Sequence, residues 1–226
     1  MAVFRRLVCA AVCAGLLSGL VAAMAHQLGT VPLILEAEVY ERAVRHEATQ
    51  VDAHPTAADE SKPESKIERA AGTLSADLLT ATGFALLLAA GFTLRGGAIT
   101  WRDGLFWGLA GFATFTVAPG LGLPPEIPGT EAAPLVARQL WWLATALSTG
   151  GALALLAFTR GASWAALAVI LIALPHLYGA PQPVDFAAAA PAALAHRFVV
   201  AATLVSFLFW VALGASTGYF YRRFER

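Results

Sequence analysis

Residues 26–48, HQLGTVPLILEAEVYERAVRHEA, carry side chains of the types that bind divalent cations. They include His26, Glu36 and Glu41, whose imidazole nitrogens and carboxylate oxygens bind such ions without any need for thiolate. The stretch follows an apolar run that ends at Ala25. It is therefore either the start of a soluble acidic domain behind a cleaved signal peptide or the outer end of a membrane helix.

The composition of the whole chain favours a membrane protein. Hydrophobic residues make up 58% of the 226 residues, charged residues only 13%, and the mean hydropathy is +0.66. A soluble domain carries about 25% charged residues, and its core could not bury so much apolar surface. We therefore predict an all-α, polytopic integral membrane helix bundle that forms a single domain of residues 1–226. The formal net charge of zero indicates no nucleic-acid partner.

Six apolar segments are long enough, or nearly so, to cross a bilayer, which takes about 20 residues. The fifth is the shortest and ends near Pro175, so five spans is the alternative. The six are Leu7–Leu28, Leu74–Leu94, Gly104–Leu123, Leu140–Thr159, Ser163–Tyr178 and Leu194–Tyr221. Between the spans we expect an acidic outer loop at 36–73 and Pro-rich outer loops at 119–139 and 179–193.

The charges between the spans predict the orientation, because cytoplasmic segments are rich in Lys and Arg. With six spans and a cytoplasmic N-terminus, the inner segments hold eight arginines against Asp103 and Glu225. The remaining thirteen acids then lie outside. We therefore expect both termini in the cytoplasm. All five histidines fall on the outer side in this arrangement: His26, His46, His54, His176 and His196.

The first span resembles a secretory signal in having MAVFRR, an apolar core and Ala23-Met24-Ala25. Its apolar run is longer than a signal core, however, and Gly15 and Gly19 form a small-xxx-small face of the kind that packs membrane helices. We therefore expect a retained helix. The same spacing recurs in Gly104/Gly108 and Gly214/Gly218. Cys9 and Cys13 are interpreted as small packing residues of this helix.

The outer loop divides into two parts. Residues 36–47 are predicted to form a helix with i,i+4 ion pairs Glu38/Arg42 and Glu41/Arg45. Glu36 has no base three or four residues later, so it is the carboxylate most available for a cation. The rest of the loop, from residue 48 to residue 72, lacks aromatic residues and is predicted to be a flexible tether. Within it, Asp52 and His54 are at most a weak metal site.

Several stretches are similar to the probable cobalt transporter subunit (CbtA) family of bacterial membrane proteins. They are FRRLVCAAVCAGLLSGLVAAMAHQ, PLILEAEVYE, GLFWGLAGFATFTVAPGLGLPPEIPG, RQLWWLATALSTGGALAL, PHLYGAPQPVDF and WVALGASTGYFYRR, which together run over almost the whole chain. The resemblance implies cobalt uptake across the inner membrane in connection with cobalamin biosynthesis. It also implies a small, single-span, histidine-bearing cobalt transporter subunit as partner, and five spans rather than six.

Cobalt(II) and nickel(II) accept imidazole and carboxylate ligands. The candidate metal ligands are His26, Glu36, Glu41, His176, Asp185 and His196, all on the outer side. We expect His26, Glu36 and His176 to form a capture site, with the helix breaking at Pro175 and freeing carbonyl groups beside His176. His176 as a helix-capping interfacial residue is an equal alternative, and His196 ranks lower because Arg197 adjoins it.

Hydroxyl groups are the polar side chains expected at depth, and they more often bond their own backbone or join helices than line a path. They are Thr114, Thr116, Thr145, Ser148 and Thr149. No predicted span carries an Asp, Glu or Lys at mid-membrane depth, which argues against a proton- or sodium-coupled carrier. No Walker motif is present, so the chain itself does not consume ATP.

The sequence leaves a second class of function open. A non-transporting membrane scaffold or a metal-delivery accessory protein would also use Gly-xxx-Gly packing faces, and a homo-oligomer remains open as well. An enzyme has little support, because the sequence shows no nucleophile–base pair, HExxH motif or paired intramembrane acids. No tightly bound cofactor is expected, and the metal would be the cargo. Membrane lipid and the divalent ion are the other partners expected.

Overall fold

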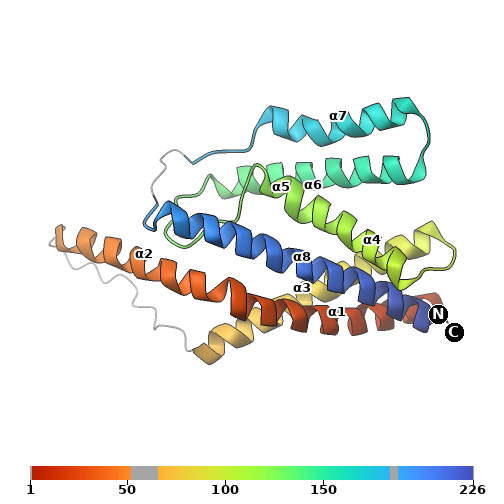
Figure 1. Ribbon diagram of the computed structural model, residues 1–226, viewed down its shortest axis with the longest axis horizontal. Coiled ribbons are helices and arrows are strands. Elements are labelled where there is room, and N and C mark those ends of the chain that lie inside the picture. The colour runs from red at the N-terminus through yellow and green to blue at the C-terminus, as the bar shows by residue number, and fades with distance from the viewer. Residues whose placement is uncertain (1, 52–65, 184–187, 226) are drawn as a thin grey trace.

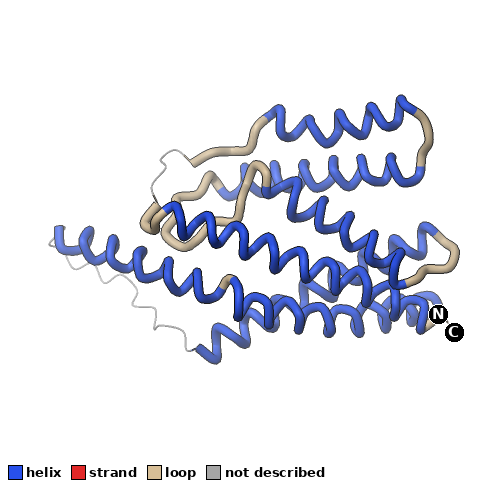
Figure 2. Tube along the Cα trace, viewed as in Figure 1, coloured by secondary structure: helices blue, strands red, loops and turns tan. Residues whose placement is uncertain are grey.

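The computed structural model describes residues 2–51, 66–183 and 188–225, and these are almost entirely helical (Figures 1 and 2). The only pairing outside helices in these ranges is a single antiparallel bridge between Thr130 and Ala188. The elements are α1 Ala2–Gly29, α2 Val31–Val51, α3 Lys66–Arg95, α4 Trp101–Phe112, η1 Ala113–Val117, α5 Ala118–Gly120, α6 Leu135–Phe158, α7 Ala162–Tyr178 and α8 Ala192–Arg223. The predicted all-α helical bundle is confirmed.

Successive long segments of the bundle run in opposite directions (Figure 1). The order is α1, α3, the α4–η1–α5 segment, α6, α7 and α8. Both ends of the chain lie at the same end of the bundle, called the terminal end below, where Arg6 and Glu225 form a 2.8 Å ion pair. The opposite end, called the far end, holds the α1–α2 junction and the starts of α6 and α8.

Four helices are long and apolar enough to cross a membrane, namely Val3–Gly29, Ile67–Arg95, Leu135–Phe158 and Ala192–Arg223. The expected third span corresponds to α4, η1 and α5, which join through residues of right-handed helical backbone at Ala113 and Ala118. Within it, η1 is a five-residue π-helix. The expected fifth span corresponds to α7, a shorter apolar helix of 17 residues. Apolar helices of these lengths define a membrane protein.

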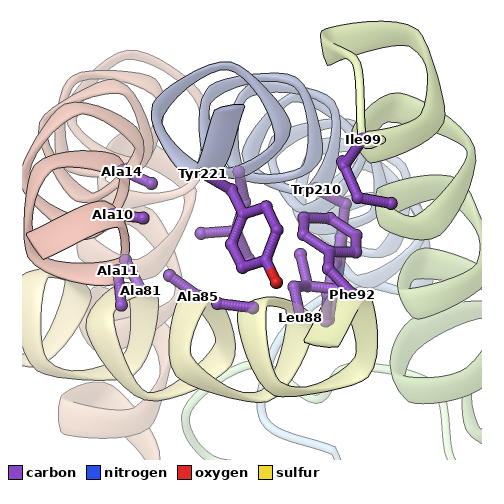
Figure 3. Packing of buried hydrophobic residues seen from close by; sticks show 12 residues of the cluster. Ala10, Ala11, Ala14, Ala81, Ala85, Leu88, Phe92, Ile99, Trp210 and Tyr221 are labelled. Carbon is purple, nitrogen blue, oxygen red and sulfur yellow. The ribbon is translucent and has the colours of Figure 1, made fainter. Parts of the chain in front are cut away.

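Small residues let α1 pack closely against α3 (Figure 3). A Cβ atom on Gly15 would lie 2.7 Å from the Thr82 Cα atom, and one on Gly19 would lie 2.9 Å from the Leu78 Cα atom. Larger residues at either position would therefore push the helices apart. Five alanines continue this contact: Ala10, Ala11, Ala14, Ala81 and Ala85. The predicted small-xxx-small face of the first helix therefore packs against α3.

The other two glycine pairs pack against each other, between α4 and α8. A Cβ atom on Gly108 would lie 2.9 Å from the Gly214 Cα atom, and one on Gly218 would lie 3.0 Å from the Gly104 Cα atom. The helix backbones are in direct contact there, as in small-xxx-small crossings of membrane helices. Cys9 and Cys13 are free and half-buried, in agreement with a packing role.

Helix α2 continues beyond α1 at the far end. The turn between them keeps helical hydrogen bonds, from the Thr30 amide to the His26 carbonyl and from the Ile34 amide to the Thr30 carbonyl. One face of α2 packs on α8 and the far-end loops through a second apolar cluster. That cluster contains Leu33, Ala37, Ile127, Ala190, Leu194 and Phe198.

The predicted outer helix and its ion pairs are present, but α2 ends later and α3 begins earlier than expected. Helix α2 runs to Val51, beyond the expected end at residue 47. Arg42 bonds Glu38 at 2.9 Å and Arg45 bonds Glu41 at 2.8 Å, as expected. Residues 66–72, predicted as part of the tether, are helical because α3 begins at Lys66. Residues 52–65, including His54, lie outside the described residues.

Candidate functional site

The last turn of α1 lies beside an acidic residue of α3, Asp77. Gly19 allows this approach, since a Cβ atom there would be only 3.1 Å from the Asp77 carbonyl oxygen. The His26 Nε2 atom lies 3.8 Å from the Asp77 Oδ1 atom. Both side chains are sheltered, with 35% of the His26 side chain and 17% of the Asp77 side chain exposed. An imidazole and a carboxylate thus face each other inside the bundle.

Thr30 orients the His26 ring. The Thr30 hydroxyl donates to the His26 carbonyl at 3.3 Å, so its oxygen can accept a hydrogen bond from a protonated His26 Nδ1, 2.8 Å away. Thr30 is only 3% exposed, so the side chains packed around it restrict its movement. In the tautomer that carries its proton on Nδ1, a lone pair remains on Nε2, the atom that faces Asp77. Metal-binding histidines commonly have such a partner on the second ring nitrogen.

Asp77 has one carboxylate oxygen without a partner. Its Oδ2 atom is buried and makes no hydrogen bond within the described part of the chain. A buried, unsatisfied polar group is costly, and more so when it is charged. Metal–ligand bonds to imidazole and carboxylate are about 2.0–2.2 Å long, so one ion fits between donor atoms 3.8 Å apart. A divalent cation there would satisfy both side chains.

The two side chains line a cavity of about 150 Å³, called the inner cavity below. Its walls come from three helices, and their polar groups besides His26 and Asp77 are the hydroxyls of Thr80 and Ser206. The remaining lining residues are Ala22, Ala202, Val205 and Phe209. One imidazole, one carboxylate and two hydroxyls would form a sparse donor set for a metal ion.

A larger cavity of about 640 Å³, called the vestibule below, lies at the far end. It is enclosed by the 119–126 loop, the start of α6 and one face of α8. Glu126 and Arg138 form a 3.0 Å ion pair in its wall. Thr116 of η1 also lines the vestibule, and its Oγ1 atom lies 2.7 Å from the Ser206 Oγ atom of the inner cavity.

Glu36, Glu38 and Glu41 of α2 have basic partners. Glu36 has no base within its own helix turn, as expected, but its Oε2 atom lies 3.8 Å from the Arg197 Nη1 atom, so it is less available for a cation than expected. The spacing of residues within α2 could not predict this ion pair, because Arg197 belongs to α8. Glu41 bonds Arg45. His196 is exposed and lines an open groove of about 520 Å³ beside Gly29.

His176 lies on α7, which packs chiefly against α6 and away from α1 (Figure 1). Its ring meets the Trp141 ring edge to face at 5.7 Å, and its Nε2 atom is buried without a protein partner among the described residues. The predicted helix break at Pro175 is not found, because α7 continues to Tyr178. The Pro175 carbonyl accepts hydrogen bonds from Trp141 Nε1 at 3.1 Å and from the Gly179 amide at 3.1 Å.

The structure does not bring the residues of the expected capture site together. Within the described residues, no three of the His, Cys, Asp and Glu side chains lie close enough to share a metal ion. His26, Glu36 and His176 are therefore separate, and Asp185 lies outside the described residues. The pair that does form contains His26, which the sequence predicts, and Asp77, which it does not. Asp77 lies near the outer end of the predicted span Leu74–Leu94, so the absence of Asp, Glu and Lys at mid-membrane depth stays a prediction.

The hydroxyl groups mostly behave as expected. Thr145 bonds the Trp141 carbonyl at 2.8 Å and Ser148 bonds the Thr145 carbonyl at 3.1 Å. The Thr116–Ser206 bond instead joins two helical segments. Thr149 is the exception, since its buried Oγ1 atom has no partner among the described residues.

The apolar helices indicate a membrane protein, with an imidazole and a carboxylate facing each other between α1 and α3. Residues 4–222 match the model of the family described as probable cobalt transporter subunit (CbtA), and the chain belongs to that family. The description implies one component of a larger transporter with cobalt as cargo, and it suggests a non-enzymatic role. No curated protein and no solved structure matches the chain.

Proposed function

We propose that this chain is the membrane component of a bacterial uptake transporter for cobalt(II), or a closely related divalent cation, in the inner membrane. The observation that carries the proposal is the His26–Asp77 pair, with its 3.8 Å separation and the unpartnered Asp77 oxygen. Ionisable residues inside membrane spans are rare and mark ion pathways. Family membership supplies the cargo.

In this proposal His26 and Asp77 bind the ion directly, and Thr30 positions the imidazole. Glu36, Glu41 and His196 lie at the far end and raise the local concentration of cations. They are weak ligands at most, because Arg197 and Arg45 accompany the two glutamates. His176 and Asp185 stay candidate ligands for a second, separate contact with the ion.

The proposed topology is six crossings with both termini in the cytoplasm. The alternating directions of α1, α3, the α4–η1–α5 segment, α6, α7 and α8 support six crossings, and the shared position of the termini supports an even number (Figure 1). The arginines of the terminal end support its cytoplasmic placement. The far end, with the vestibule, then faces the periplasm.

The proposed partner is a small, single-span, histidine-bearing protein of the same transporter, since the family description implies more than one component. The chain offers no nucleotide-binding motif. The driving force therefore comes from an ion gradient, the membrane potential or the partner. Asp77 is the residue through which a coupled proton would act, because its carboxylate must lose any proton before it binds a metal.

Cobalt uptake into proteoliposomes tests this function. Liposomes holding the chain, with and without the small partner, should accumulate cobalt, and His26→Ala and Asp77→Asn should abolish the accumulation. His46→Ala is the matched control, since His46 is an exposed histidine of α2 far from the pair. If the chain binds cobalt but no preparation accumulates it, the alternative of a metal-delivery accessory protein replaces transport.

A further inference from the structure

We infer that cations reach the His26–Asp77 pair from the vestibule, through a gate formed by the hydroxyls of Thr116 and Ser206. The inference rests on the proposed function, because it supplies the access route to that metal site. No residue lines both cavities. A side-chain contact nevertheless joins a residue of one wall to a residue of the other. That contact is the 2.7 Å Thr116–Ser206 hydrogen bond.

The face of α8 between the two cavities leads from one to the other. Val199 and Thr203 line the vestibule, and Ser206, one turn further along, lines the inner cavity. Residues spaced by three and four positions share one face of a helix. Most other hydroxyls of α8 bond their own backbone, as Thr203 does with the Val199 carbonyl at 2.7 Å. Ser206 instead bonds across to η1, so this hydroxyl pair closes the passage.

The element that carries Thr116 has a second conformation within reach. Residues Ala113–Val117 form a π-helix, which is rare and is found mostly as single turns near functional sites. Returning this turn to α-helical hydrogen bonding shifts its side chains around the helix axis and separates Thr116 from Ser206. Phe115 stabilises the closed form, because its ring stacks on Trp210 with centroids 5.6 Å apart and planes 5° apart.

The chemistry of the passage suits a small hydrated cation. The vestibule's fixed charges include Glu126 and Arg138, which neutralise each other at 3.0 Å. Hydroxyl oxygens can replace part of the ion's water shell when the pair opens, while in the closed pair the two hydroxyls are bonded to each other. Opening therefore exchanges one hydroxyl–hydroxyl bond for two hydroxyl–cation contacts. The cation itself favours the open gate.

Thiol labelling tests the gate without depending on metal binding. The reporter is Ala22→Cys, a position that lines the inner cavity and is 3% exposed, in the full chain with Cys9→Ala and Cys13→Ala. The probe is 2-(trimethylammonium)ethyl methanethiosulfonate, whose fixed positive charge keeps it out of the apolar part of the detergent micelle. Thr116→Val with Ser206→Ala should speed labelling by about tenfold, since losing one hydrogen bond changes an opening equilibrium by roughly that factor.

Thr203→Val is the matched control, because its hydroxyl lies on the same face but bonds its own helix. An unchanged labelling rate in the Thr116→Val/Ser206→Ala protein, or an equal increase in the control, overturns the gate. Ser206→Ala alone gives the same test should the double variant misfold. Cobalt(II) added during labelling should protect the thiol. Faster labelling in the double variant without protection by cobalt would keep the gate and refute the proposed metal site.

Discussion

Arg6 and Glu225 lie at opposite ends of the sequence, and their side chains meet in a 2.8 Å ion pair. The Arg6 guanidinium also lies 3.8 Å from the centre of the Tyr221 ring, and the Tyr221 hydroxyl lies 2.9 Å from the Thr93 hydroxyl. Helices α1, α3 and α8 are therefore tied together at the terminal end. Because residues near both ends of the chain meet there, this contact supports the proposed even number of membrane crossings.

This arrangement predicts the topology of the chain. A reporter that is active only in the cytoplasm should be active when fused after Arg226 and inactive when inserted at Glu131, in the far-end loop. The reason is that eight of the thirteen arginines lie in the segments expected at the terminal end, and such residues stay in the cytoplasm. Periplasmic activity of the fusion after Arg226 would contradict the even number of crossings.

Close backbone contact between α4 and α8 predicts a strong effect of enlarging Gly214. The Val side chain of Gly214→Val would collide with Gly108, whose Cα atom lies 2.7 Å from an added Cβ atom. Overpacking of this kind costs about 1–3 kcal/mol or more, so the melting temperature in detergent should fall clearly. Gly151→Val is the matched control, as nothing lies within 4 Å of a Cβ atom there. Equal melting temperatures would show that the two helices do not touch.

The Thr30–His26 bond predicts a loss of metal affinity without a loss of fold. Thr30→Val keeps the shape of the side chain and removes the partner of Nδ1, which lies 2.8 Å from the hydroxyl. Loss of such a partner weakens metal binding by about 10–100-fold. The check is the cobalt dissociation constant of the purified chain, with Thr203→Val as the control. An unchanged constant would mean that Thr30 does not position the imidazole.

The Glu36–Arg197 pair predicts opposite effects of removing its two charges. Glu36→Gln should raise the external cobalt concentration needed for half-maximal uptake, because the far end then attracts cations less. Arg197→Gln should lower that concentration for the converse reason. Both shifts should be a few-fold at low ionic strength and shrink in salt, since exposed charges are screened beyond about 10 Å at 0.1 M. Changes in the maximal rate instead would indicate a role in the transport step.

Much of the fold follows from patterns in the sequence. The long apolar segments, the Gly-xxx-Gly spacing and the i,i+4 ion pairs each depend on residues close together in the chain, and each is present in the structure. The π-helix at Ala113–Val117 and the partner of Glu36 depend on contacts between distant segments. Spacing along one helix carries no information about such contacts.

The same distinction between local patterns and contacts of distant segments applies to the candidate site. His26 is predictable from its residue type and its place at a helix end, but its neighbour Asp77 comes from another helix. One signal points to Asp77, namely a lone carboxylate inside the predicted span Leu74–Leu94, which alone suggests function. The sequence groups His176 with His26 because both end apolar helices on one side. The packing of α7 against α6 separates them, and only the order of the helices in space reveals this.

The most direct test of the His26–Asp77 site is cobalt(II) binding to the purified full chain, followed by the visible absorption bands of the bound ion. Imidazole ligation should shift these bands from those of aqueous cobalt(II), with one ion bound per chain. His26→Ala and Asp77→Asn should each remove the shifted bands, while His46→Ala should keep them. Unchanged bands and affinity in the His26→Ala and Asp77→Asn proteins, folded as the parent is, would contradict the account.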